Sequence, residues 1–347
     1  MKLIDDITFF LEGKGFECSR MLQDGLEVIC TRIHDGKHRR IVIPLEISAE
    51  SPEMAHTFSE AACSCIESIR KEEGYPIIIT EDRWNSRKSM TQARLLAHLE
   101  VFSQAFARNC EIRRIEKKEA QEFLQANHSY GDAACRYRYG MFLKRQTGHL
   151  AEGFPVTPGM TEDKPGMTEV KTGMTEIGPG TLVAVATFSN ARKWVKGDKE
   201  IRSYEWTRFA SLPGLRISGG MGKMLKVFIN EVRPDDIMSY ADLEWSEGSV
   251  YKALGFRLEG SKEPVMFVVD PDRWERFPVK PGMTEDKPGM TEVKPGMTED
   301  KPGMTEVKPG MTEVKPGMRD VIAGLTGNLY FRNFGSNKYR LKLTDYE

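Results

Sequence analysis

The chain has 347 residues and carries 50 lysines and arginines against 51 aspartates and glutamates, for a formal net charge of −1. The whole chain therefore lacks the basic excess that is typical of nucleic-acid-binding proteins. No apolar run approaches the roughly 20 residues of a membrane helix, and Asp5 and Asp6 make the N-terminus acidic before a signal-like core develops. We expect a cytoplasmic protein of about two domains with no membrane partner.

Cysteine usage points to neither a metal nor a disulfide framework. The cysteines form no CxxC pair and show no Cys/His spacing suited to zinc. We expect reduced, mostly buried thiols, and we assign no metal site and no catalytic cysteine. The positions are Cys18, Cys30, Cys63, Cys65, Cys110 and Cys135.

The N-terminal third alternates helical and strand patterns. Apolar spacing predicts a first helix, two strands, a second helix, a buried strand and a long third helix. The apolar stripe of the third helix runs through Leu95, Leu96 and Leu99 to Phe106. The expected ranges are 5–13, 26–33, 40–47, 54–71, 75–80 and 90–107.

This order of elements resembles the restriction-endonuclease-like fold, and residues 77–84 with Arg94 and Leu99 resemble the closing strand and helix of mismatch-repair-type and phage homing nucleases. The resemblance implies acidic residues that hold a divalent metal, with a lysine two places after one of them. Glu46 fits an acidic position, but Ser48 stands in place of the lysine.

The strand before Glu46 offers no convincing aspartate, although Asp24 and Asp35 are near in sequence. We therefore expect residues 1–107 to form a degenerate nuclease-like α/β module that has lost cleavage. A DNA-binding, scaffolding or purely structural role stays open for it.

Residues 108–278 form the expected second domain. A helix over 117–127 is followed by His128, which we interpret as a surface or capping histidine, and then by strand patterns at 139–143, 181–188 and 204–209. Next comes a helix whose apolar face holds Met221, Met224, Leu225, Phe228, Ile229 and Val232. A strand over 237–241, a short helix over 249–254 and a strand over 264–269 complete this part.

The turn that opens the apolar helix reads Gly219-Gly220-Met221-Gly222-Lys223. Glycines on both sides of one apolar residue let the backbone turn tightly and expose bare N–H groups to an anion. The helix dipole adds partial positive charge at that end. The five residues are our candidate phosphate-binding site, and a simple turn is the alternative.

The order of elements and this turn together resemble the GNAT superfamily of acyl-coenzyme A N-acyltransferases. The family loop has the pattern Gln/Arg-x-x-Gly-x-Gly/Ala with a leucine three residues later, which Gly220, Gly222 and Leu225 match. Ile217 stands where glutamine or arginine is usual, and Arg216 comes one place early. The resemblance implies a mixed α/β sheet flanked by helices and acetyl-coenzyme A as co-substrate.

The same resemblance suggests the catalytic residues. Tyr251 occupies the position of the tyrosine that commonly protonates the departing thiolate, although packing under a turn is an equal alternative. Glu205 is our candidate base, because its strand neighbours Tyr204 and Trp206 would point to the opposite face. Asp242 and Glu244 compete for that role. We expect strands 204–209 and 237–241 to separate into a cleft that Tyr251 faces.

Two segments repeat the unit Pro-Gly-Met-Thr-Glu-(Asp/Val)-Lys, within 156–180 and 279–318. Proline and glycine in nearly every unit exclude a coiled coil despite the step of seven. We expect disordered inserts with no catalytic role, and deletion of 158–178 should be tolerated. A repeat that recruits a partner is the alternative. Residues 319–347 should complete the fold with a strand.

The resulting prediction is an N-acyltransferase that acetylates an unknown amine. The alternative is a mobile-element or phage-derived protein that binds or modifies DNA, to which the cluster Arg136-Tyr137-Arg138-Tyr139 could contribute phosphate contacts and stacking. A folded relic without activity is the third possibility. The acceptor cannot be inferred from these motifs, because loops and pocket shape determine it.

Overall fold

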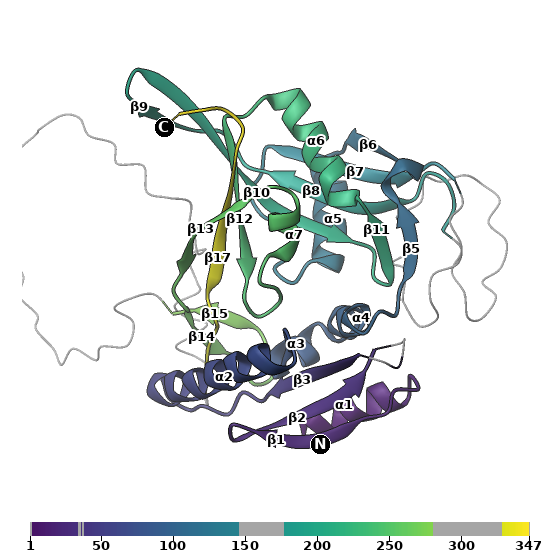
Figure 1. Ribbon diagram of the computed structural model, residues 1–347, viewed down its shortest axis with the longest axis vertical. Helices are drawn as coiled ribbons and strands as arrows, with labels where there is room; N and C mark the ends of the chain where they lie inside the picture. Colours follow the sequence, from purple (N-terminus) through teal and green to yellow (C-terminus); the bar gives the residue numbers. More distant parts are fainter. Residues whose placement is uncertain (1, 34–35, 37, 146–176, 280–327, 347) are drawn as a thin grey trace, which may run out of the picture.

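The computed structural model describes residues 2–33, 36, 38–145, 177–279 and 328–346, and Figure 1 shows their arrangement. Most of each predicted repeat segment lies outside these residues, so the prediction of disorder is not addressed. Asp35 also lies outside them. The described part is a mixed α/β protein, as predicted, with four sheets.

The N-terminal module is a sheet of four strands in the order β1-β2-β3-β4, with β3 and β4 parallel. Its strands are β1 (Ser19–Gln23), β2 (Leu26–Arg32), β3 (Arg39–Leu45) and β4 (Ile77–Thr80). Alternating apolar residues bury both faces: α1 packs through Ile7 and Leu11, and α2 packs through Cys65, Ile66 and Ile69. The helices are α1 (Leu3–Glu12), α2 (Pro52–Glu72), α3 (Glu81–Ser86) and α4 (Lys88–His98).

The second sheet has eight strands, in the order β13-β17-β12-β10-β8-β7-β6, with β9 added to β10. Only β10 and β12 pair in parallel within this sheet, and the other pairs are antiparallel. Its strands are β6 (Cys110–Arg114), β7 (Tyr137–Leu143), β8 (Leu182–Phe188), β9 (Arg192–Lys196), β10 (Lys199–Ser211), β12 (Asp236–Asp242), β13 (Arg257–Lys262) and β17 (Ser336–Lys342).

Two helices cover the two faces of this sheet (Figure 1). On one face, α6 (Gly220–Val232) inserts Phe228, whose ring stacks on Phe188 at 3.9 Å between centroids. On the other face, α5 (Lys117–Asn127) buries Ala120, Phe123 and Leu124. The short helix α7 (Ser249–Ala253) follows β12. The apolar face of α6 is thus held against the sheet, and its N-terminal turn is fixed with it.

Two small sheets join the modules. Strand β5 (Ser103–Phe106) pairs in parallel with β11 (Leu215–Ser218), and a 3-10 turn at Ala107–Asn109 leads into β6. Strands β14 (Met266–Val269), β15 (Arg276–Pro278) and β16 (Leu329–Arg332) form the other sheet, which packs on α2. The C-terminal strand β17 then enters the large sheet between β12 and β13.

The prediction of one helix over 90–107 is wrong. Helix α4 ends at His98, and Glu100 takes a left-handed conformation with φ of 65°. The amide of Val101 then donates to the Leu96 carbonyl (2.9 Å), a helix-terminating bond that satisfies one exposed carbonyl. Beyond this point Ala105 and Phe106 belong to β5, because its pairing with β11 outweighs the local helical spacing.

The boundary of the first insert also needs correction. Ile177, inside the range expected to be dispensable, is 3% exposed and packs in the core of the large sheet. The carbonyl of Gly178 accepts the hydroxyl hydrogen of Thr181 (2.8 Å). Residues 177 and 178 therefore belong to the fold, and a deletion of 158–178 would remove a core side chain.

Candidate functional site

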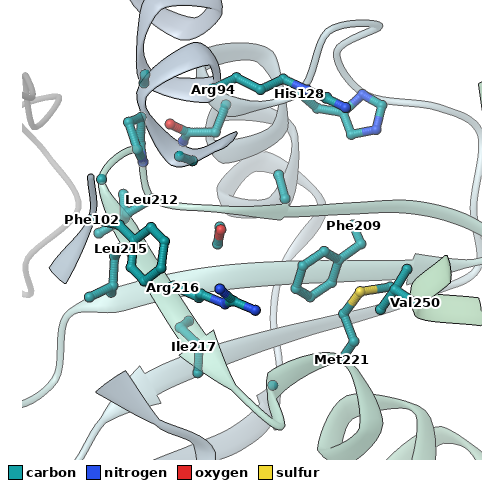
Figure 2. Close-up of a pocket in the computed structure, with 18 of the residues that line it drawn as sticks. Arg94, Phe102, His128, Phe209, Leu212, Leu215, Arg216, Ile217, Met221 and Val250 are labelled. Atoms are coloured by element: carbon teal, nitrogen blue, oxygen red, sulfur yellow. The ribbon is translucent and has the colours of Figure 1, made fainter. Parts of the chain in front are cut away.

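A cavity of about 800 Å³ lies between the N-terminal module and the large sheet (Figure 2). Its floor is the second half of β10 with β11, its sides are the starts of α6 and α7, and its roof is α4 with residues 127–129. Figure 2 shows Arg94 and His128 on one side, and Met221, Phe209 and Val250 on the other. Its size is in the range of small-molecule sites.

The predicted glycine turn lines this cavity. Gly219 has φ of 76°, a left-handed conformation that a side chain would strain, and it caps α6 without a side-chain hydrogen bond. The first bond of the helix runs from the Lys223 amide to the Gly219 carbonyl (3.0 Å). Among the described residues, the amides of Gly220, Met221 and Gly222 have no hydrogen-bond partner outside their own helix. These three N–H groups are donors that a bound anion could use.

Two of the glycines are also needed for close packing. A Cβ at Gly220 would approach the Ile217 side chain to 3.2 Å, and one at Gly222 would approach Leu254 to 3.2 Å. A side chain at either position would require its neighbour to shift, so the two glycines favour the close approach of α6 to β11 and α7.

The basic residues near the turn have different roles. The ammonium of Lys223, a predicted contributor, donates to the carbonyls of Ala107 (2.9 Å) and Cys110 (2.6 Å). Its side chain thus ties α6 to the connection after β5. Arg216 lines the cavity, and its guanidinium lies 5.1 Å from the centre of the Phe102 ring.

The parallel pairing of β10 and β12 ends before the part of β10 that lines the cavity. The two strands pair only where Ser203, Tyr204 and Glu205 face Asp236, Ile237 and Met238. On its other side, β10 has an irregular register with β8 that skips Thr207. Bulges of this kind bend a strand and redirect its side chains. The redirected half of β10, from Phe209 to Ser211, forms part of the cavity wall.

Tyr251 lies at the point where the strands separate. Its hydroxyl is 2.9 Å from that of Ser239, the first residue of β12 beyond the paired segment. Its ring stacks on Tyr339 and contacts Trp206 edge-on. Burial raises the pKa of Tyr251, so the phenol keeps its proton at neutral pH. Three neighbours on the same stretch, Val250, Ala253 and Leu254, line the cavity, whereas Tyr251 itself lies behind them.

The three candidate bases lie outside the cavity wall. Glu205 is partly buried on the face opposite Tyr204 and Trp206, as strand alternation predicts, and lies 4.0 Å from Arg192. Asp242 accepts a hydrogen bond from the Tyr130 hydroxyl (2.6 Å). Glu244 is buried in an ion pair with Arg276 (2.6 Å), and burial raises its pKa. The base stays a prediction.

Helix α4 contributes site residues that the sequence analysis did not assign. Met90, Arg94, Ala97 and His98 line the cavity, and their spacing places them on one face of the helix. Arg94 donates to the Trp245 carbonyl (3.0 Å), and its guanidinium lies 3.8 Å from the centre of the Trp245 ring. Their steps of three and four residues mark one helix face, but no local pattern links this face to the glycine turn.

Two histidines in the cavity wall are uncharged. Burial lowers the pKa of His98 and of His128 to about 3 in each case, and the charge of nearby Arg94 adds to the effect. The Nδ1 atom of His128 accepts the amide hydrogen of Tyr130 (3.1 Å). His128 thus stabilises its loop, as interpreted from the sequence, and also lines the cavity.

The acidic residues of the N-terminal module serve as structural acceptors. Glu46 accepts the amide of Leu3 (3.0 Å), and Glu81 accepts the amide of Ile47 (2.8 Å). Asp24 lies at the β1–β2 turn with φ of 47°. Within the described ranges, no group of three or more histidine, cysteine or acidic residues could hold a metal ion.

The arginine and tyrosine cluster at the other end of the large sheet lines an open hollow of about 680 Å³. Two of the charges beside it are paired: Arg114 forms an ion pair with Glu231, and the Arg202 guanidinium lies 3.8 Å from Asp235. The guanidinium of Arg138 donates to the Cys135 carbonyl (2.7 Å), and Tyr139 is buried. Arg136 is exposed and lines the hollow, so part of the positive charge of the cluster stays open to solvent.

Comparison with protein-family models and with curated proteins gave no match. Of the helices in the described part of the chain, none has the length and apolar content to cross a membrane.

Proposed function

We propose that the protein is an N-acyltransferase that uses acetyl-coenzyme A and acetylates an amine in the cavity beside β10. The observation that carries this proposal is the start of α6, where three residues whose amides have no partner outside the helix line a cavity of about 800 Å³. A helix start with free amides and a favourable dipole suits a pyrophosphate. Arg216 on the adjacent strand adds a positive charge on the same cavity.

The divergence of β10 and β12 supports the same function. An extended ligand that starts at the glycine turn can run along the separated half of β10, where Phe209 and Ala210 line the wall. The GNAT resemblance places acetyl-coenzyme A between two such strands. Acetyl-coenzyme A would supply an activated acyl group as a thioester.

Tyr251 is the proposed proton donor. Its raised pKa keeps the hydroxyl protonated, and its contact with Ser239 places the hydroxyl where the two strands part. A general acid at this point could protonate a departing thiolate. Because the phenol lies behind Val250 and Leu254, it would act from the strand side of the cavity.

The proposed role of the N-terminal module is structural and does not include cleavage of nucleic acid. Its helix α4 forms the roof of the cavity, and its acidic residues bind backbone amides rather than lying free for a metal. We infer a scaffold that completes the acceptor side of the site. The DNA-binding alternative keeps the exposed Arg136 as its support, whereas the arginines at residues 114 and 202 lie against acidic side chains.

Acyl transfer is tested by following free thiol release from acetyl-coenzyme A with the full-length protein and a panel of primary amines. Release that depends on both the amine and the protein, with the acetylated amine identified by mass spectrometry, is the expected result. Hydrolysis at the buffer rate with every amine would count against the proposal.

A further inference from the structure

One feature of the cavity wall is its charge. Among the described residues that line it, none is an aspartate or a glutamate, whereas Arg94 and Arg216 both line it. Arg216 lies on β11 beside the glycine turn, and Arg94 lies on α4 across the cavity (Figure 2). The two ends of the cavity thus each carry one cation. The phosphates of a coenzyme account for Arg216 but leave Arg94 without a function.

Arg94 differs from Arg276 and Arg340, two other enclosed arginines. Arg276 is paired with Asp82 and Glu244, and Arg340 with Asp236 and Glu259, so carboxylates raise the pKa of both guanidinium groups. No carboxylate of a described residue lies within 4.0 Å of Arg94. Burial lowers its pKa to about 10. Asp242 and Glu244 act on this partly buried guanidinium only from a longer range, so an anionic ligand in direct contact would stabilise its charge.

The contacts of Arg94 orient it and leave donors available. Its flat face stacks on the Trp245 ring, and one Nη2 hydrogen goes to the Trp245 carbonyl. A guanidinium has five N–H donors, so the edge that faces the cavity keeps a fork suited to a carboxylate or a phosphate. The Trp245 indole therefore fixes the plane of the Arg94 guanidinium, and the remaining edge of the guanidinium can bind a ligand.

His128 adds a second donor beside Arg94 (Figure 2). Since Nδ1 accepts the Tyr130 amide hydrogen, the neutral ring carries its own hydrogen on Nε2. Arg208, Arg94 and Arg83 surround this imidazole with positive charge. Arg208 donates to the carbonyls of Gly131 and Thr207, and it too has no ion-pair partner among the described residues. The α4 end of the cavity is therefore rich in donors, and its lining carries positive charge, whereas the nearby carboxylates of Asp242 and Glu244 are outside the lining.

We propose that the end of the cavity formed by Arg94 and His128 binds an acidic group of the acyl acceptor, which is therefore a primary amine that also carries a carboxylate or a phosphate. This inference depends on the proposed acyltransfer function for the identity of the second substrate. With the coenzyme phosphates at the glycine turn and the acidic group at α4, the amine lies between them, beside Phe209 and Leu212.

The same charge distribution has a chemical consequence for the amine. Acylation requires the free base, and a wall without carboxylates does not hold a bound amine in its ammonium form. One proton leaves for solvent before attack, the nitrogen lone pair forms the C–N bond, and the C–S bond breaks with its electron pair on sulfur. The nitrogen then loses its second proton to solvent, and the proposed acid Tyr251 protonates the thiolate. The lining of the cavity thus favours deprotonation of the amine, whereas Glu205 lies outside the wall and does not contact the amine.

The test uses full-length protein and three product-like probes in isothermal titration: N-acetylglycine, N-acetylphosphoethanolamine and the neutral N-acetylglycinamide. A separate titration with coenzyme A reports on the cofactor end. We expect at least one acidic probe to bind, and the neutral probe to bind at least tenfold more weakly. The two acidic probes distinguish a carboxylate from a phosphate site.

Arg94→Gln is the decisive variant, with Arg94→Lys to retain the charge and Arg257→Gln, an exposed arginine on β13, as the matched control. Arg94→Gln should weaken the acidic probe by about tenfold to a hundredfold, the range for a hydrogen bond to a charged group. Arg94→Lys should weaken it less, and Arg257→Gln should leave it unchanged. The affinity for coenzyme A should stay the same in all variants.

Equal binding of the neutral and acidic probes, or an Arg94→Gln variant with unchanged affinity, overturns the inference. Coenzyme A binding without binding of any probe also overturns it and leaves the acyltransferase proposal standing. Binding of an acidic probe through Arg94 without coenzyme A binding supports an anion site and counts against the acyltransferase proposal.

Discussion

The hydroxyl of Ser239 donates a hydrogen bond to the carbonyl oxygen of Trp206 (3.0 Å), one residue beyond the last paired positions of β10 and β12. This side-chain bond replaces the next backbone bond of the parallel ladder. The strands can therefore part without leaving that carbonyl unsatisfied. The same hydroxyl lies 2.9 Å from the Tyr251 oxygen, which connects the separation of the strands to the proposed acid.

Replacement of Tyr251 by phenylalanine tests its role. Because the phenyl ring keeps the stacking on Tyr339, the fold should be retained while proton donation is lost. We expect kcat for acetyl transfer to fall by about a hundredfold or more, with unchanged affinity for acetyl-coenzyme A. In the unsubstituted protein, kcat should hold until the pH exceeds the ordinary tyrosine value of about 10. An equal kcat in Tyr251→Phe would remove this residue from the mechanism.

The stability of the junction between modules should depend on Arg276. Its guanidinium binds Asp82 and Glu244 in the interior and donates to Thr80 Oγ1 (2.8 Å). Removing it leaves the buried Glu244 without its ion-pair partner and leaves Asp82 with Arg83 alone, 3.8 Å away. Arg276→Leu should lower the free energy of unfolding by about 3–5 kcal/mol. The control is Arg20→Leu, which breaks an exposed ion pair with Asp5 and should cost at most about 1 kcal/mol. Similar losses in urea denaturation of both variants would contradict this assignment.

Acid should destabilise the protein partly through His98. Its pKa is about 3 in the folded protein and about 6.5 in an unfolded chain. The stabilising contribution is complete above pH 6.5 and is lost as the pH falls toward 3, because only the unfolded state takes up the proton in that window. The melting temperature of His98→Gln should fall less steeply between pH 7 and pH 4 than that of the unsubstituted protein. His56→Gln, on the exposed side of α2, should show the unaltered slope.

The first repeat segment should be dispensable within narrower limits than the sequence suggested. Since Ile177 lies in the core and Gly178 bonds Thr181, a deletion of residues 158–174 keeps both contacts. We expect an unchanged melting temperature and unchanged acetyl transfer. A deletion of 158–178 should lower the melting temperature, because it removes the Ile177 side chain. Loss of activity in the shorter deletion would give the repeat a functional role.

Much of the fold could be predicted where one face of an element is apolar. The spacing of Met224, Leu225 and Phe228 defined α6, and continuous apolar residues defined β8. Strand β13 was missed because all six of its residues are exposed, so it has no alternating pattern. Strand β5 was assigned to a helix because its pairing with β11 is a long-range contact. Local spacing does not contain that information.

The candidate site also has one part that could be predicted from the sequence and one part that could not. The glycine turn could be predicted because its conformation is local: Gly219 requires a positive φ, and the helix start follows it directly. The roof of the cavity could not, because Arg94 and His98 come from a module more than a hundred residues earlier and reach the site by tertiary packing. Lys223 was predicted to contribute to the site because it lies in the glycine turn. Its ammonium instead binds the carbonyls of Ala107 and Cys110, and local sequence could not predict this contact with a distant segment.

Isothermal titration of full-length protein with acetyl-coenzyme A is the most direct test of the central claim, with Met221→Pro and Met221→Ala as paired variants. Proline is tolerated in the first helical turn and removes one of the free amides, whereas alanine keeps it. We expect one site per chain, an affinity about tenfold or more weaker in Met221→Pro, and a smaller loss in Met221→Ala. Well-folded protein that does not bind acetyl-coenzyme A, or binds it equally after Met221→Pro, would contradict the account.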